Sequence, residues 1–121
     1  MNILLVALGS AAGGVARYLV GTFIPAVGGF PFATLSVNIV GSFLIGLFSG
    51  LLTRFAGGAN AEALRLVLVV GFCGGFTTFS TFSNETLRLI ESSHGFVAVG
   101  SILASVLAGL LAVFLGYAIS R

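Results

Sequence analysis

The stretch from Thr77 to Ser83 contains the side chains of this sequence that are best suited to bind an ion. It reads Thr-Thr-Phe-Ser-Thr-Phe-Ser, so hydroxyl groups surround two phenylalanines. Phe79 and Phe82 are three residues apart and would share one face of a helix. The edge of an aromatic ring carries partial positive charge, so ring edges can surround an anion without holding it too tightly to leave. The pair is consistent with an anion path and also with ordinary packing, because the chain has 12 phenylalanines.

Other polar side chains occur within long apolar stretches. Asn38 has Thr34 four residues before it and Ser42 four residues after it, so the three would share a helix face. An uncompensated amide in hydrocarbon is costly, so Asn38 must face protein or a polar path. Ser101 and Ser105 repeat this spacing later in the chain. They are weaker indicators, because a serine can hydrogen-bond to the backbone of its own helix.

Two charged residues stand close to these polar groups. Arg17 lies about one and a half turns before the end of the first apolar stretch. Its side chain could extend to the membrane surface or attract anions at a vestibule. Glu85 and Arg88 are three residues apart and could pair across a turn of helix.

The composition argues against an enzyme and against nucleic-acid binding. One histidine, one cysteine and three dispersed glutamates cannot assemble a catalytic carboxylate pair or a His/Cys metal site. The five arginines are scattered singly, whereas a nucleic-acid-binding surface needs clustered basic residues.

The elements that must position these groups are membrane helices. Hydrophobic residues make up 58% of the chain, charged residues only 7%, and the mean hydropathy is +1.21. Lipid must therefore be the solvent for most of the surface. We predict an all-α integral membrane protein, with residues 1–121 forming a single domain. About 20 residues span the hydrocarbon core, which predicts four transmembrane helices. Their ranges are 3–23, 32–52, 66–90 and 96–119.

The third of these spans is expected to be broken near residues 74–77. Its smooth apolar part, 66–76, is too short to cross a bilayer alone. Gly74-Gly75 lie near the end of this part, and Thr77-Thr78 follow it directly. Paired glycines and adjacent threonines are poor residues for a helix interior. An interrupted backbone at membrane depth must face protein or a cavity, where its carbonyls are ready ligands for a hard cation such as Na⁺. The alternative is a loop at the membrane surface.

The arginines do not select one orientation in the membrane. Arg54, Arg65 and Arg121 belong to the side that holds the termini, and Arg17 and Arg88 to the other. This three-to-two split is too even for the positive-inside rule to fix one orientation in the membrane. We therefore predict that the protein inserts both ways and forms an antiparallel, dual-topology dimer. Small residues recur at helical spacing on every span, which suits close helix packing within one chain or between two.

Three stretches of this sequence resemble the small fluoride channels of the Fluc, or CrcB, family. They are Gly-Ser-Ala-Ala-Gly-Gly-Val-Ala-Arg-Tyr at 9–18, Thr-Leu-Ser-Val-Asn-Ile-Val-Gly-Ser-Phe-Leu-Ile-Gly at 34–46, and Gly-Phe-Cys-Gly-Gly-Phe-Thr-Thr-Phe-Ser-Thr-Phe-Ser at 71–83. The third is highly specific, and the chain length and number of spans match as well. Two features depart from the family: Ala33 replaces a glycine, and the fourth span lacks the tyrosine and several hydroxyls that some members carry.

The resemblance implies a dimer with two antiparallel fluoride pores. It implies that Phe79 and Phe82 line the pores and that Asn38 donates a hydrogen bond along the path. The other implied pathway residues are polar or charged: Ser80 and Thr81 near the break, Ser105 on the fourth span, Arg17 at a vestibule and Glu85 close to the exit. It also implies that carbonyls of Gly74 and Thr77 from both subunits hold a structural Na⁺ at the dimer interface.

The function expected from the resemblance is passive export of fluoride across the cell membrane, which lowers cytoplasmic fluoride. The partner subunit could be an identical chain or a sister chain of opposite orientation. An alternative is a small four-helix multidrug or cation exporter. Proton-coupled exporters of that kind need a carboxylate inside the first helix, and residues 3–23 contain none. A membrane subunit without transport activity is a third reading, which the Thr/Phe/Ser stretch disfavours.

Overall fold

The computed structural model describes residues 1–55, 58, 60–77 and 79–121, and within these ranges the regular structure is helical. Four helical spans are long and apolar enough to cross a membrane: Asn2–Phe23, Phe32–Arg54, Ala61–Glu91 and Gly95–Ser120. The first, second and fourth are the continuous helices α1, α2 and α6. The prediction of an all-helical protein with four spanning helices is confirmed, and the chain is a multi-pass membrane protein.

The third span is built from several shorter helices. They are α3 (Ala61–Leu64), the π-helix η1 (Arg65–Cys73), α4 (Gly74–Phe76) and α5 (Phe79–Glu91). Thr77, between α4 and α5, has an extended backbone with φ −94° and ψ 140°. Its N–H and its hydroxyl both donate to the carbonyl of Cys73, at 3.0 and 2.8 Å. Thr78 lies outside the described residues.

This span begins earlier than the apolar pattern predicts. The pattern places its start at residue 66, whereas α3 starts at Ala61. Glu62 and Arg65 form an ion pair across one turn, with Arg65 Nε 3.1 Å from Glu62 Oε2. Pairs of this spacing stabilise a helix at its polar end, so the helix continues beyond the hydrocarbon-facing residues.

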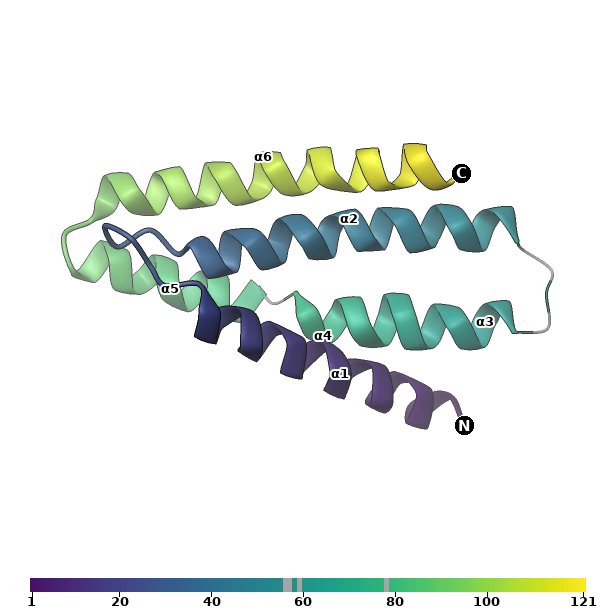
Figure 1. Ribbon diagram of the computed structural model, residues 1–121. Helices are drawn as coiled ribbons and strands as arrows, with labels where there is room; N and C mark the ends of the chain where they lie inside the picture. Colours follow the sequence, from purple (N-terminus) through teal and green to yellow (C-terminus); the bar gives the residue numbers. More distant parts are fainter. Residues whose placement is uncertain (56–57, 59, 78) are drawn as a thin grey trace.

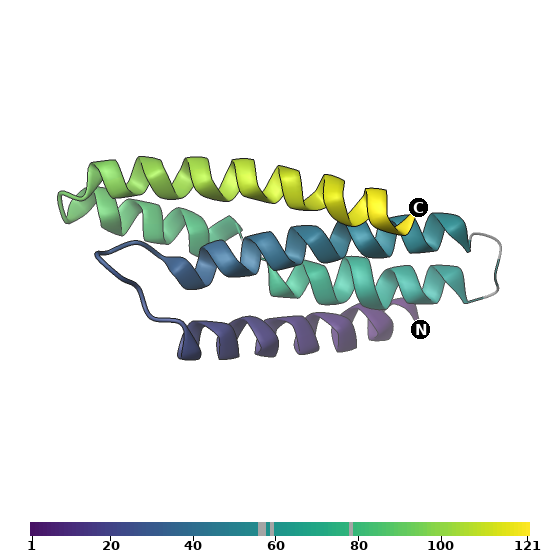
Figure 2. The same ribbon diagram turned by 45° about the horizontal axis from the view of Figure 1, so that its top comes forward.

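The helices pack side by side around α2 (Figure 1). Most of the packing joins α2 to α6 and α1 to η1 and α4. Both views place α6 along α2, and η1 and α4 of the third span on the other side of α2 with α1 against them (Figures 1 and 2). The last part of the third span, α5, instead packs beside α6. Both termini lie at the end of the bundle where α2 ends and α3 begins (Figure 1). The hairpin between α5 and α6 and the link between α1 and α2 lie at the opposite end.

Close approach between α2 and α6 depends on two glycines. A Cβ atom on Gly46 would collide with the carbonyl oxygen of Val113, and one on Gly116 would collide with that of Phe43. Gly100, earlier in α6, has open space where its Cβ would be. Part of the small-residue pattern on α6 therefore packs within one chain, as expected where helices associate through backbone contact.

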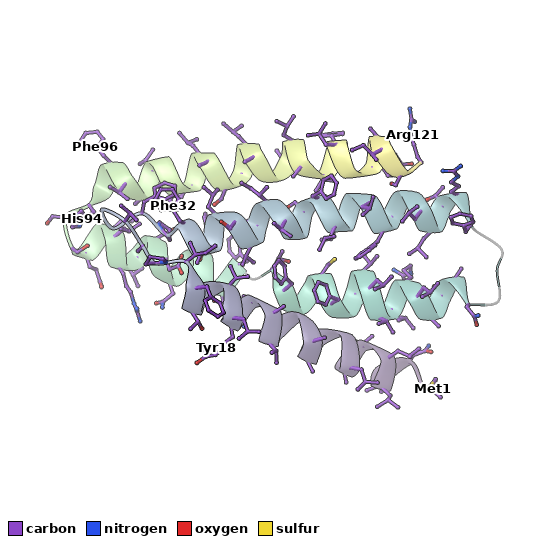
Figure 3. The ribbon with its side chains drawn as sticks, viewed as in Figure 1. Met1, Tyr18, Phe32, His94, Phe96 and Arg121 are labelled. Carbon is purple, nitrogen blue, oxygen red and sulfur yellow. The ribbon has the colours of Figure 1, made fainter. Side chains whose placement is uncertain are left out.

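Large apolar side chains cover the outside of the bundle. They project outward all around the helices in Figure 3, where the labelled Phe96 and Tyr18 point away from their neighbours. Phe96 is 98% exposed, and leucines and phenylalanines continue along the outer face of α6. A surface of this kind is stable only in contact with hydrocarbon or with another apolar surface.

Candidate functional site

Two hollows in the bundle meet at the side chain of Asn38. The first, which we call the polar hollow, has a volume of about 270 Å³, and its polar lining includes Arg17, Thr34, Asn38, Thr81 and Glu85. The second, the aromatic hollow, has a volume of about 390 Å³. It is lined by Phe79, Phe82, Asn38 and Ser105, together with apolar residues of α2 and α6. The Asn38 amide therefore stands where a polar route could continue from one hollow into the other.

A hydrogen bond between α2 and α5 forms one wall of the polar hollow. The Thr34 hydroxyl, on a residue only 9% exposed, donates to Glu85 Oε1 at 2.8 Å. The second carboxylate oxygen, Glu85 Oε2, is buried and accepts no hydrogen bond from the described residues. A buried carboxylate oxygen without a donor is costly. The hollow is therefore suited to water or another hydrogen-bond donor beside Glu85.

Arg17 lines the same hollow from α1 and contacts the third span. Its Nε donates to the carbonyl oxygen of Gly75 at 3.4 Å. Gly75 lies in α4, whose last carbonyls lack helical partners and carry the partial negative charge of a helix C-terminus. The half-buried guanidinium therefore points inward, where it both adds positive charge to the hollow and binds the end of α4.

The aromatic hollow is formed around the first turn of α5. The ring centroids of Phe79 and Phe82 are 6.0 Å apart, with their planes inclined by 40°. Phe82 is half-buried, whereas Phe79 is 81% exposed. The hydroxyl oxygen of Ser105, on α6, is buried and has no hydrogen-bond partner among the described residues. Ring edges and one uncommitted hydroxyl thus border the same space, a combination that can bind a small anion weakly.

The structure divides the predicted site residues between the two hollows. Arg17, Thr81 and Glu85 line the polar hollow, and Phe79, Phe82 and Ser105 line the aromatic hollow. Ser80 is exposed on α5 and lines neither. Sequence reasoning did not select Thr34 as a site residue, although its spacing four residues before Asn38 was a signal for it.

The carbonyls of Gly74 and Thr77 can be tested as ligands for Na⁺. Gly74 is exposed, and nothing lies within 4 Å of where its Cβ would be. Thr77 is extended, so the carbonyls of α4 are at a helix end, where a cation is favoured. Carbonyl oxygens suit a hard cation, but such ions take more ligands than two. The donor set therefore fits Na⁺ in kind, but two carbonyls alone do not complete its coordination.

A comparison with known proteins places this bundle in a family. Residues 4–117 match the family model described as CrcB-like protein, Camphor Resistance (CrcB). The chain belongs to the CrcB-like family. The matched range includes every residue that lines the polar and aromatic hollows, so both are part of the shared CrcB-like domain.

Curated relatives match this CrcB-like chain over nearly its whole length. A protein of Coxiella burnetii is 48% identical over 124 residues, covering 100% of this chain and 98% of its own. A protein of Agrobacterium fabrum is 49% identical over 123 residues, which cover 100% of this chain and 97% of the relative. One of Pyrococcus furiosus is 44% identical over 120 residues, covering 99% and 96%. Each of the three is named a fluoride-specific ion channel.

Proposed function

We propose that this CrcB-like chain is a fluoride-selective channel that lets fluoride leave the cell down its electrochemical gradient. The observation that carries the proposal is the full-length similarity, at 48% identity, to a relative named a fluoride-specific ion channel. The four membrane-spanning helices and the polar groups between them support it. Passive export of this kind lowers the cytoplasmic fluoride concentration.

The proposed path runs from the polar hollow, past Asn38, to the aromatic hollow. Fluoride is small and strongly hydrated, so the protein must offer donors that replace its water. The Asn38 amide N–H groups, the hydroxyls of Thr81 and Ser105, and the ring edges of Phe79 and Phe82 are the donors available along this route. Arg17 raises the local anion concentration at the polar end, and Glu85 lies beside the same opening. Ser80 adds polar surface near Thr77.

We also propose that the working unit is an antiparallel dimer whose third spans are interrupted at Thr77. The support is the extended backbone of Thr77 and the exposure of Gly74 and Phe79 on a single chain. Carbonyls of Gly74 and Thr77 from two subunits would hold Na⁺, and the ion would supply a fixed positive charge that joins the two helix ends. The second subunit is an identical chain or a sister chain of opposite orientation.

The test is passive ion efflux from liposomes that contain the purified protein and are loaded with fluoride or chloride. We expect fast fluoride efflux and negligible chloride efflux. Phe79→Ile removes a ring edge from the aromatic hollow and should slow fluoride efflux by at least tenfold. Phe96→Ile removes an outward-facing ring at the start of α6, away from both hollows, and should leave fluoride efflux unchanged.

Equal efflux of chloride and fluoride would contradict the proposed selectivity. Absence of fluoride efflux, both with this chain alone and with a sister chain added, would contradict the channel itself.

A further inference from the structure

A third hollow lies at the end of the bundle that holds the termini, between α2 and the start of the third span. Its volume is about 420 Å³. Its walls are mainly apolar: Phe48, Leu51 and Leu52 on α2, Phe55 just after α2, and Leu64 and Leu68 on the third span. It shares no residue with the polar or the aromatic hollow. We call it the apolar groove.

The groove reaches from the membrane surface into the hydrocarbon region. Phe48 lies six residues before Arg54, the last residue of α2. At about 1.5 Å per residue, the groove therefore extends about 9 Å inward from the helix end, where hydrocarbon tails replace water. Water is not favoured in an apolar space of this kind. An acyl chain suits a space of this kind better than water does.

A positive charge lies beside one of the residues that line the groove, although Arg54 does not itself line it. The guanidinium carbon of Arg54 is 6.0 Å from the ring centroid of Phe55, which lines the groove. Within the described ranges, no carboxylate lies within ion-pair distance of Arg54. An arginine at the membrane surface favours a phosphate group, with which it can form paired charge-assisted hydrogen bonds.

The neighbouring charges favour a headgroup with net negative charge. Glu62, which follows the lining residue Ala61 on α3, is already bound by Arg65, through Nε at 3.1 Å and a terminal nitrogen at 3.4 Å. This carboxylate is therefore committed and is a poor partner for the ammonium of a zwitterionic lipid. We propose that the apolar groove binds one acyl chain of an anionic phospholipid whose phosphate contacts Arg54. The proposal is independent of fluoride conduction and needs only that the chain spans a membrane.

The headgroup contact can be tested by native mass spectrometry of the full chain in detergent. The probes are phosphatidylglycerol and phosphatidylcholine with identical acyl chains. We expect phosphatidylglycerol to bind more tightly, and Arg54→Gln to weaken it about fivefold, as loss of one arginine near the surface would. The loss for phosphatidylcholine should be smaller, because its ammonium offsets the charge of its phosphate. The matched control is Arg121→Gln, which removes the same charge at the same end of the bundle, just after α6, a helix that contributes no lining residue to the groove.

The acyl-chain contact needs a separate pair of variants. Ala61 lines the groove, whereas Ala63, also on α3, does not. Ala61→Phe should fill the groove and weaken binding of both lipids, and Ala63→Phe should not. Circular dichroism and gel filtration check the fold of each variant. If Ala61→Phe does not fold, the comparison of Arg54→Gln with Arg121→Gln still tests whether the lipid headgroup contacts Arg54.

Three results would overturn the proposal. Equal losses in Arg54→Gln and Arg121→Gln would show that lipid binds only through diffuse surface charge. Unchanged lipid binding by a folded Ala61→Phe variant would show that no tail occupies the groove. Absence of bound phospholipid, combined with a smaller dimer fraction in Ala61→Phe, would show that a second copy of the chain covers the groove instead.

Discussion

At the scale of single residues, Asn38 and Thr34 have the clearest separate roles. They are four residues apart on α2, and both line the polar hollow. Thr34 is committed to Glu85 through its hydroxyl, whereas Asn38 also borders the aromatic hollow. One residue therefore holds two helices together, and the other can offer donors to an ion. Two substitutions separate these roles.

Asn38→Asp should reduce fluoride efflux from liposomes by at least tenfold. The side chain keeps its size and shape, but it loses the N–H donors and gains negative charge where an anion must pass. Asn84→Asp, on the exposed side of α5 and outside both hollows, makes the same chemical change and should conduct like the wild type. Wild-type efflux from a folded Asn38→Asp variant would show that the path does not pass this residue.

Thr34→Val should lower the free energy of unfolding by about 1 to 3 kcal/mol. Valine and threonine have nearly the same shape, but valine has no hydroxyl to donate to Glu85 Oε1. Because Glu85 Oε2 already lacks a donor, the variant would leave both oxygens of this partly buried carboxylate unpaired. Thermal unfolding in detergent measures the change, and Thr34→Ser, which keeps the hydroxyl, should recover most of it. Thr53→Val is the control, because Thr53 is exposed and bonds only within its own helix. Equal stability of Thr34→Val and wild type would show that this hydrogen bond contributes little.

At the scale of elements, the third span differs most from a simple membrane helix. Its parts combine a π-helix, a short α4, an extended Thr77 and the polar α5. The glycines and threonines of this region were visible in the sequence and predicted an irregular backbone. The π-helix at Arg65–Cys73 was not predicted, because its side chains have the same apolar character as those of an α-helix. The other spans were predictable from hydropathy alone, because each is one continuous apolar helix.

Packing of α2 against α6 should be sensitive to methyl groups at particular glycines. Gly116→Ala places a Cβ against the carbonyl of Phe43 and should destabilise the protein by about 1 to 3 kcal/mol. Gly100→Ala lies on the same helix in open space, so it should be neutral or slightly stabilising, because alanine favours helix more than glycine. Thermal unfolding of the two variants side by side measures the difference. Equal stability would mean that the two helices can separate at no cost.

At the scale of the whole molecule, a single chain leaves an aromatic ring of the site exposed and offers too few carbonyl ligands for a cation. Phe79 is largely exposed although it lines the aromatic hollow. Gly74 is exposed beside the extended Thr77, and two carbonyls are too few ligands for a hard cation. These features support the proposed dimer, in which a second chain would cover the rings and supply the remaining ligands.

Replacing Na⁺ should test the proposed ion at the interface without measuring transport. We expect a large organic cation such as N-methyl-D-glucamine, at equal ionic strength, to lower the thermal stability and the cross-linked dimer fraction of the purified protein. A cation of that size cannot enter a cage of backbone carbonyls. Returning the protein to NaCl should restore both the thermal stability and the cross-linked dimer fraction. Identical dimer fractions in the two salts would contradict a structural Na⁺.

The sequence by itself determined the helical class and the number of spans, and it predicted which residues could form an anion path. Apolar stretches of sufficient length can satisfy their backbone in lipid only as helices, so local composition decides the architecture. It also placed Phe79 and Phe82 on a common helix face, because a spacing of three residues does so in any helix.

Only the tertiary structure decided which distant residues meet. Thr34 and Glu85 are 51 positions apart, and Arg17 and Gly75 are 58 apart, yet each pair is joined by a hydrogen bond. Hydropathy does not determine how neighbouring helices rotate or slide against each other. That is decided by which glycines allow backbones to touch, as Gly46 and Gly116 do between α2 and α6. The division of the polar residues between two hollows follows from that packing.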